Sequence, residues 1–183
     1  MGLLSIIRKL KAKDHELRIL VLGLDNAGKT TIMKRLTDQP TSTISPTLGF
    51  NITTFSLPPY VLNFWDIGGQ RTIRAYWRNY FEQTDALVWV VDSADRTRLG
   101  DCAEELHALL KEDRLMGASL LVFANKQDIA GALSVEEISR VLRLDILATH
   151  RWSIRPCCAA VAADNLLDGI RWLVNDVSAH VLH

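Results

Sequence analysis

The sequence has few cysteines and no long apolar stretch. Its three cysteines are Cys102 and the adjacent pair Cys157 and Cys158, and this spacing matches neither a zinc site nor a disulfide framework. We therefore expect three reduced thiols in an intracellular protein. The longest apolar runs, 86–91 and 120–124, are far too short to cross a membrane and instead suit buried parallel strands.

Net charge is also absent. Lys plus Arg number 21 and Asp plus Glu number 21, so no overall field favours nucleic acid as a partner. The beginning of the chain lacks a secretory signal and its end lacks a prenylation cysteine. A length of 183 residues suits one domain with a substantial core. We expect a soluble, monomeric, cytoplasmic protein with a single domain over 1–183.

The chain does contain a phosphate-binding loop, Gly-Leu-Asp-Asn-Ala-Gly-Lys-Thr at 23–30. It lies between a strand predicted over 17–22 and a helix predicted over 31–37, where backbone N–H groups and the helix dipole favour an anion. Lys29 is expected to reach the β- and γ-phosphates, which makes it a catalytic candidate, and the Thr30 hydroxyl is expected to ligate Mg²⁺. The predicted phosphate contacts are Gly23, Asp25, Asn26, Ala27, Gly28, Lys29, Thr30 and Thr31.

Strand and helix patterns alternate through the rest of the chain. Strands are predicted over 50–57, 60–65, 87–91, 120–124 and 152–158, and helices over 98–114, 134–142 and 166–181. The first two strands form a hairpin whose Pro58 and Pro59 must lie outside the ladder. This order predicts an α/β fold, with a mostly parallel six-stranded sheet and helices on both faces.

The first residues form a candidate amphipathic helix, which we separate as 1–14 from a nucleotide-binding domain at 15–183. Leu3, Ile6, Ile7 and Leu10 fall on one face. That face can lie on the domain itself, on a partner or on a membrane. Gly2 is present, but the myristoylation pattern needs Ser or Thr where this chain has Ile6, so only weak or transient membrane contact is expected.

Guanine recognition is predicted from Asn125-Lys126-Gln127-Asp128, which follows an apolar strand. The Asp128 carboxylate can accept two hydrogen bonds from guanine, and adenine offers no such pair of donors. The aliphatic stem of Lys126 can cover the face of the base. We expect Asn125, Lys126 and Asp128 to bind the nucleotide, GTP or GDP.

Metal and water chemistry are predicted from 65–70, Trp-Asp-Ile-Gly-Gly-Gln. Asp66 ends a strand and can hold Mg²⁺, directly or through water. The Gly69 N–H can approach a γ-phosphate, and Gln70 can orient an attacking water as the catalytic residue. Thr47, in the loop 39–49, can add its hydroxyl to Mg²⁺ when the triphosphate is bound.

Together these motifs make the chain resemble the Arf family of small GTPases over nearly its whole length. The motifs that carry the likeness are 23–30, Pro46-Thr-Leu-Gly-Phe-Asn51, 65–70, Tyr76-Trp-Arg-Asn-Tyr-Phe81 and 125–128. The likeness is strongest to the Arf-like branch, with the Arl-two subgroup nearest and the Arl-three subgroup next. The resemblance implies a Ras-like phosphate-loop fold and a guanine-nucleotide switch that slowly hydrolyses GTP.

The resemblance also implies partners and a mechanism. In the family the N-terminal helix packs on the GDP form and is displaced when the hairpin slides on GTP loading. Phe50, Trp65 and Tyr80 match a patch that binds effectors, although they can equally be core aromatics. The implied partners are an exchange factor, an activating protein, prenyl-binding delta-type lipid carriers and tubulin-folding cofactor D, with a cytoplasmic and cytoskeleton-associated location.

One departure concerns the last guanine motif, usually Ser-Ala, which here lies within Cys157-Cys-Ala-Ala160. Counting from Asn165 selects Ala159 and Ala160, and counting from Trp152 selects Cys158 and Ala159, so Ala159 and Ala160 are the candidate backbone contacts to guanine. The phosphate loop contains no Arg, which favours an activating partner. The alternatives are a phosphate-loop kinase, a module that holds GTP with little hydrolysis, and a myristoylated trafficking GTPase.

Overall fold

The structure is a computed structural model, and it describes residues 15–161 and 163–181. The amphipathic helix expected at 1–14 lies outside the described residues. The strands are β1 (Glu16–Leu22), β2 (Phe50–Leu57), β3 (Tyr60–Ile67), β4 (Ala86–Asp92), β5 (Ser119–Asn125) and β6 (Trp152–Pro156). The helices are α2 (Lys29–Leu36), α3 (Arg71–Arg74), α4 (Leu99–Leu110), α5 (Val135–Val141) and α6 (Asp164–Val181), with short 3₁₀ turns η1 (Trp77–Tyr80), η2 (Asp113–Leu115) and η3 (Leu144–Ile146).

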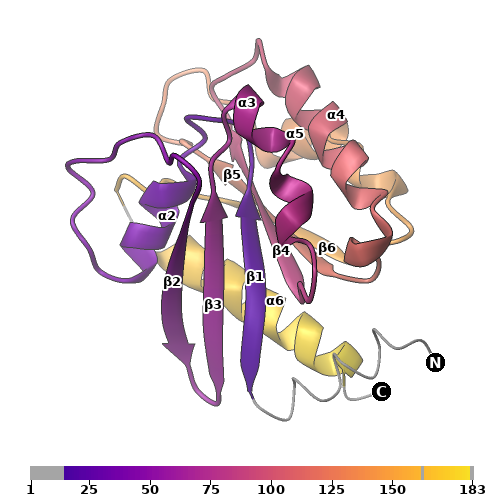
Figure 1. Ribbon diagram of the computed structural model, residues 1–183. Helices are drawn as coiled ribbons and strands as arrows, with labels where there is room; N and C mark the ends of the chain where they lie inside the picture. Colours follow the sequence, from indigo (N-terminus) through magenta and orange to yellow (C-terminus); the bar gives the residue numbers. More distant parts are fainter. Residues whose placement is uncertain (1–14, 162, 182–183) are drawn as a thin grey trace.

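The six strands form one sheet in the order β2-β3-β1-β4-β5-β6 (Figure 1). Only the β2–β3 pair is antiparallel, so the mostly parallel six-stranded sheet is confirmed. After β1 the chain builds one side of the sheet and then crosses to the other, which makes the carboxyl end of β1 the point where the winding direction changes. Ligands of open α/β sheets bind at such a point. The phosphate-loop motif begins there.

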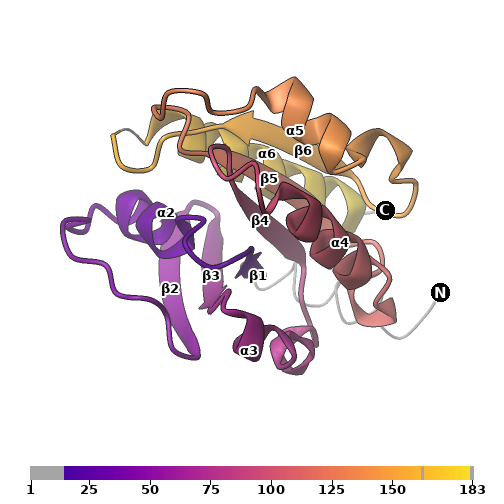
Figure 2. The same ribbon diagram turned by 90° about the horizontal axis from the view of Figure 1, so that it is seen from above.

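Helices cover both faces of the sheet, as predicted. On one face α2 and α6 bury apolar side chains such as Ile32 and Ile170 against the strands. On the other face α4, α5 and η1 do the same with Leu106, Ile138 and Trp77. Figure 1 shows α6 crossing behind the sheet and α3 in front of it, and Figure 2 shows the same layers from above. The two cores hold the strand ends, and therefore the loops after them, in fixed positions.

The hairpin is confirmed, since Leu57 pairs with Tyr60 and the two prolines form its tip outside the ladder. Several predicted boundaries differ from the structure by one or two residues, and two ends were placed too late. The helix expected over 98–114 ends at Leu110, because the chain turns there so that Leu115 is fully buried. The last strand ends at Pro156 rather than 158, and the chain then turns into the loop before α6.

The sequence pattern predicts no helix in the aromatic and basic stretch that precedes β4. The structure folds it as α3 and η1, and Trp77 and Phe81 are both buried. Their spacing of four residues was the available signal, because residues i and i+4 share one face of a helix. The turn matters for the site, because it supports the segment that carries Gly69 and Gln70.

Candidate nucleotide-binding site

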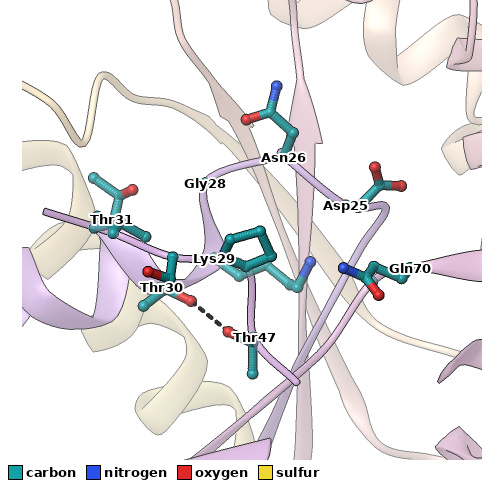
Figure 3. Close-up of a pocket in the computed structure, with 12 residues that line it drawn as sticks. Asp25, Asn26, Gly28, Lys29, Thr30, Thr31, Thr47 and Gln70 are labelled. Carbon is teal, nitrogen blue, oxygen red and sulfur yellow. Dashed lines mark hydrogen bonds between the residues drawn. The ribbon is translucent and has the colours of Figure 1, made fainter. Parts of the chain in front are cut away.

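The loops after β1 and β3 and the segment before β2 enclose a cleft of about 320 Å³ (Figure 3). The cleft is lined by Asp25, Asn26, Gly28, Lys29, Thr30, Thr31, Ile44, Ser45, Pro46, Thr47, Gly69 and Gln70. It therefore brings together residues from all three segments that were predicted to hold phosphate and metal. Of the remaining predicted phosphate contacts, Gly23 begins the loop and Ala27 is buried beneath it.

Gly28 shows why the phosphate loop needs glycine. Its φ is +98°, in the left-handed region that other residues rarely adopt. A Cβ built on it would lie 2.3 Å from Nδ2 of Asn125. A side chain at this position is thus excluded by both backbone conformation and space, and the loop can close directly onto the guanine motif.

Lys29 begins α2, and its side chain turns back into the cleft. The ammonium donates to the carbonyl oxygens of Gly23 at 3.0 Å and Leu24 at 2.9 Å. Burial lowers the pKa of Lys29 from 10.5 to about 8, although the nearby Asp66 and Asp25 carboxylates oppose that shift. A buried ammonium whose charge is this poorly compensated is suited to an anionic ligand such as a phosphate.

Three oxygens converge beside Lys29. The Thr30 hydroxyl donates to Oδ2 of Asp66 at 2.6 Å and lies 3.0 Å from the hydroxyl oxygen of Thr47. The second carboxylate oxygen of Asp66, Oδ1, is buried and has no hydrogen-bond partner among the described residues. Burial raises the pKa of Asp66, against the opposing effects of Thr30 and Lys29.

This oxygen set fits Mg²⁺. Mg²⁺ binds hard oxygen ligands, keeps several waters and completes its shell with substrate phosphates. The buried, unpaired Oδ1 of Asp66 is the position where a cation or its water would relieve an unsatisfied charge. The predicted metal contacts Thr30, Thr47 and Asp66 are therefore brought together, although the segment that carries Thr47 has no regular secondary structure.

Gly69 and Gln70 are held by the turn that follows them. Trp77 donates from Nε1 to the carbonyl of Gly68 at 3.0 Å, and Arg74 donates from Nε to the carbonyl of Gly69 at 2.9 Å. Gln70 precedes α3 with extended backbone, and its side chain points into the cleft near the Lys29 ammonium (Figure 3). This placement suits a side chain that orients a water next to a terminal phosphate.

Two arginines near the site were not anticipated from the sequence. Arg98 donates to the Asp25 carboxylate at 2.9 Å, and Arg74 lies 3.5 Å from the same oxygen. Arg98 also bonds Asp95, and Arg74 also bonds Glu105. The phosphate loop itself contains no Arg, but the tertiary fold places two guanidinium groups against its Asp25. A sequence search for an Arg inside the loop had no means of finding them.

The guanine motif follows β5, as expected. The buried Asn125 donates from Nδ2 to the carbonyl of Ala27 at 2.9 Å, and its Oδ1 accepts from the N–H of Ala159 at 3.1 Å. Asn125 therefore joins the phosphate loop to the loop before α6. Lys126 pairs with Asp92 at 2.7 Å, while Asp128 is exposed and available to a base. Asn125 thus links the two loops, Lys126 is held in place by its ion pair, and Asp128 can accept hydrogen bonds from a base.

The loop after β6, residues 157–161, is the guanine loop. Partial burial raises the pKa of the Cys158 thiol, and the neighbouring Asp128 carboxylate raises it further. Because the N–H of Ala159 is taken by Asn125, the backbone donor left for guanine is that of Ala160, which favours the register counted from Asn165. The predicted Ala159 bonds Asn125, whereas Ala160 is exposed and lies one residue farther on. All three cysteines are free thiols, with Cys158 the one that is not buried.

Phe50, Trp65 and Tyr80 form an aromatic cluster outside the cleft. The rings of Phe50 and Trp65 stack with centroids 5.3 Å apart, and Tyr80 lies 5.4 Å from Phe50. Arg18 packs over Trp65 at 3.9 Å and donates to the carbonyl of Tyr80 at 3.1 Å. Phe50 is 44% exposed, while Trp65 and Tyr80 are half-buried against the core. The cluster is therefore neither fully core nor fully surface.

Two other classes of site are absent from the described part of the chain. No group of three or more His, Cys, Asp or Glu side chains there could hold a metal ion without help from other ligands. No helix within 15–161 and 163–181 combines the length and apolar character that a membrane span needs.

Comparison with known proteins gives consistent results. The ADP-ribosylation factor family matches residues 3–177. ADP-ribosylation factor-like protein 2 of Arabidopsis thaliana is 59% identical over 182 residues, which are 99% of this chain and 98% of the relative. The protein of the same name from Drosophila melanogaster is 55% identical over 181 residues, 99% of this chain and 98% of the relative. ADP-ribosylation factor-like protein 3 of Chlamydomonas reinhardtii is 53% identical over 177 residues, 97% of this chain and 99% of the relative.

A solved structure shares the fold. The Arl6 BBS3 small GTPase of Trypanosoma brucei, with bound nucleotide analogue GppNp, superposes with a TM-score of 0.81 at 32% sequence identity. The similarity covers 90% of this chain and 99% of that one. The Ras-like fold expected from the sequence is thereby confirmed.

Proposed function

Because this chain belongs to the ADP-ribosylation factor family of small GTPases, we propose that its two nucleotide states control effector binding through Phe50, Trp65 and Tyr80. The chain is an Arf-like guanine-nucleotide switch that binds GTP or GDP with Mg²⁺ and hydrolyses GTP. The geometry of the cleft explains how its own residues contribute to that activity, and the aromatic cluster supports the further step to effectors.

The hydrolytic step develops charge on the oxygens of the transferred phosphoryl group. We assign the compensation of that charge to the Lys29 ammonium and the backbone N–H groups of the phosphate loop. Bound Mg²⁺ supplies further positive charge, and Thr30, Thr47 and Asp66 are the residues that would hold it. Gln70 would orient the attacking water, since its side chain points into the cleft beside Lys29.

Hydrolysis is slow without a partner because the nearby arginines are already engaged. Arg98 and Arg74 are held by Asp25, and each has a further carboxylate partner in Asp95 or Glu105. Neither arginine is therefore free to stabilise the negative charge that develops on a terminal phosphate. An activating protein that supplies or positions an arginine for this purpose increases the hydrolysis rate by about 10³–10⁵ in related systems. Gln70→Leu should abolish the stimulated rate while leaving GDP affinity within about twofold, measured by single-turnover hydrolysis and nucleotide titration.

The observation that carries the effector proposal is the exposure of the cluster next to the loop that bears Thr47. Phe50 begins β2 immediately after that loop, and its neighbours Leu48 and Ile52 are 82% and 51% exposed. Contiguous exposed apolar side chains of this kind are typical of interaction sites. A nucleotide that orders Thr47 therefore acts on the same segment that presents Phe50.

The resemblance also implies that the β2–β3 hairpin slides between states, and sheet geometry limits that slide. In the structure β3 pairs with β1 in the register that sets Asp66 opposite Val21. A shift by one residue would exchange the two faces of the strand, so the smallest slide that keeps its buried side chains buried is two residues, about 7 Å. Such a slide would withdraw Asp66 from Thr30 and would reposition Phe50 and Trp65.

The partners that we propose are prenyl-binding delta-type lipid carriers and tubulin-folding cofactor D. We further propose a monomer located in the cytoplasm, with association with the cytoskeleton through the tubulin cofactor. The support for both is the similarity to ADP-ribosylation factor-like protein 2 sequences at 55–59% identity. A myristoylated trafficking role is disfavoured by Ile6, and intact mass of protein expressed with an acyltransferase tests it.

Binding of a purified delta-type carrier to the two loaded forms tests the proposal. We expect at least tenfold tighter binding with a non-hydrolysable GTP analogue than with GDP, measured by calorimetry. Phe50→Ala should weaken binding of the triphosphate form, whereas Ile146→Ala, equally apolar and 66% exposed outside the cluster, should not. Equal affinity for the two loaded forms, or no effect of Phe50→Ala, would contradict the effector role of the cluster.

A further inference from the structure

The guanine loop lies against α2, and Arg35 is the side chain that joins them. Figure 1 shows the connection between β6 and α6 beside α2. Arg35 donates from Nε to the carbonyl of Ala159 at 2.9 Å and from Nη2 to the carbonyl of Ala160 at 2.6 Å. The same Nη2 lies 3.3 Å from the hydroxyl of Thr41, near the start of the segment that carries Thr47. One guanidinium therefore contacts two nucleotide-binding segments.

The guanine loop depends on such an external partner. Its residues after Cys158 are Ala159, Ala160 and Val161, whose side chains offer no hydrogen bonds. Buried or half-buried backbone groups need partners, and within the loop the described residues show one backbone–backbone bond, from the N–H of Val161 to the carbonyl of Cys158. The planar fork of an arginine can bind two adjacent carbonyls at once, which a lysine ammonium does less well.

Fixing these carbonyls also fixes N–H directions. In a trans peptide the N–H points opposite to the C=O of the same unit. When Arg35 holds the carbonyl of Ala159, the N–H of Ala160 is therefore directed away from Arg35. The N–H of Ala159 is held separately by Oδ1 of Asn125. Because Asn125 takes the N–H of Ala159, the N–H of Ala160 is the backbone donor left for O6 of guanine, and Arg35 sets its orientation.

We propose that Arg35 is a positioning residue for guanine recognition, which holds the backbone donor of the guanine loop in place from α2. The proposal rests on the proposed function, because it assigns a base to this loop. It also predicts that the mobilities of the guanine loop and of the segment at Thr41 are coupled, because Arg35 bonds both. Arg35 itself does not contact the base, so it acts through Ala159 and Ala160.

Dissociation of GDP, followed with purified full-length protein, tests the proposal. Arg35→Ala should raise the dissociation rate about 5–30-fold, because two charge-assisted hydrogen bonds are lost. Arg35→Lys should give a dissociation rate between those of the unmodified protein and Arg35→Ala, since an ammonium keeps the charge but cannot bind two adjacent carbonyls as the planar guanidinium does. Lys34→Ala is the matched control. Lys34 is the preceding residue of α2, and its ammonium donates to the carbonyl of Thr43, which lies outside the guanine loop. This variant should stay within about twofold of the unmodified protein.

A second measurement distinguishes alignment of the backbone donor to guanine from a general weakening of nucleotide binding. In 6-thio-GDP the O6 acceptor is replaced by sulfur, a weak acceptor, so the unmodified protein should release it faster than GDP. If Arg35 aligns the donor to O6, Arg35→Ala should bring the ratio of the two rates towards one. A rate within twofold of the unmodified protein, or an unchanged ratio with both nucleotides released faster, would overturn the proposal. Failure of the unmodified protein to bind GDP would instead contradict the proposed function.

Discussion

Lys29 should take up a proton when nucleotide binds at alkaline pH. Burial in the folded protein lowers its pKa from 10.5 to about 8. A group with that pKa is about three-quarters deprotonated at pH 8.5 and about one-tenth deprotonated at pH 7. Phosphate beside the ammonium favours the charged form and raises its pKa. Binding of Mg²⁺–GDP should therefore take up about 0.7 proton at pH 8.5 and about 0.1 at pH 7.

The same shift affects stability. Keeping Lys29 charged in its buried position costs the nucleotide-free fold about 3 kcal/mol below pH 8, from the difference between 10.5 and about 8. Between those two values the unfolded chain binds more protons than the fold, so the free energy of unfolding rises with pH there. Bound phosphate offsets the cost, which gives the nucleotide-bound form a large advantage in stability near neutral pH.

Calorimetry in two buffers with different ionisation enthalpies measures the proton uptake directly. Lys29→Arg keeps a cation at every pH used, so its uptake at pH 8.5 should fall to near zero. Lys34→Ala removes a half-buried lysine that does not line the cleft, so it should leave the uptake unchanged. Any proton exchanged by Asp66 on binding Mg²⁺ would be released, which has the opposite sign. An observed binding enthalpy at pH 8.5 that does not depend on the buffer would refute the reasoning.

Two further predictions concern backbone packing and the loop clasp. A Cβ on Gly69 would lie 2.3 Å from the carbonyl oxygen of Gly23, so Gly69→Ala should force the loops apart, cost about 1–3 kcal/mol and lower affinity for a GTP analogue at least tenfold. Gly100→Ala is its control, because nothing lies within 4 Å of the added Cβ in α4, and it should stabilise the protein by about 0.5–1 kcal/mol. Asn125→Ala removes the buried clasp between the phosphate loop and the guanine loop and should cost about 1–3 kcal/mol in urea unfolding; a loss below about 0.5 kcal/mol would mean that the loops hold without it.

The aromatic cluster could be located but not interpreted from the sequence. The motif likeness named Phe50, Trp65 and Tyr80, while an effector patch and a buried core remained equal alternatives. Burial depends on which elements pack above each ring, and no local pattern contains that information. The structure places Trp65 and Tyr80 half-buried under Arg18 and leaves Phe50 44% exposed. What the cluster binds stays a prediction.

The sequence by itself predicted the phosphate loop, the Mg²⁺ oxygens, the guanine motif and six strands in their order along the chain, since each depends on a contiguous motif or on periodicity. It missed α3, and it placed the ends of one helix and one strand too late, because burial of Leu115 and the turn after Pro156 are tertiary effects. Only the tertiary structure decided the contacts that support the site. Arg98 reaches Asp25 across 73 residues and Arg35 reaches Ala159 across 124. Such pairs leave no spacing in a single sequence, because the sheet and its packed helices, and not the chain between them, bring them together.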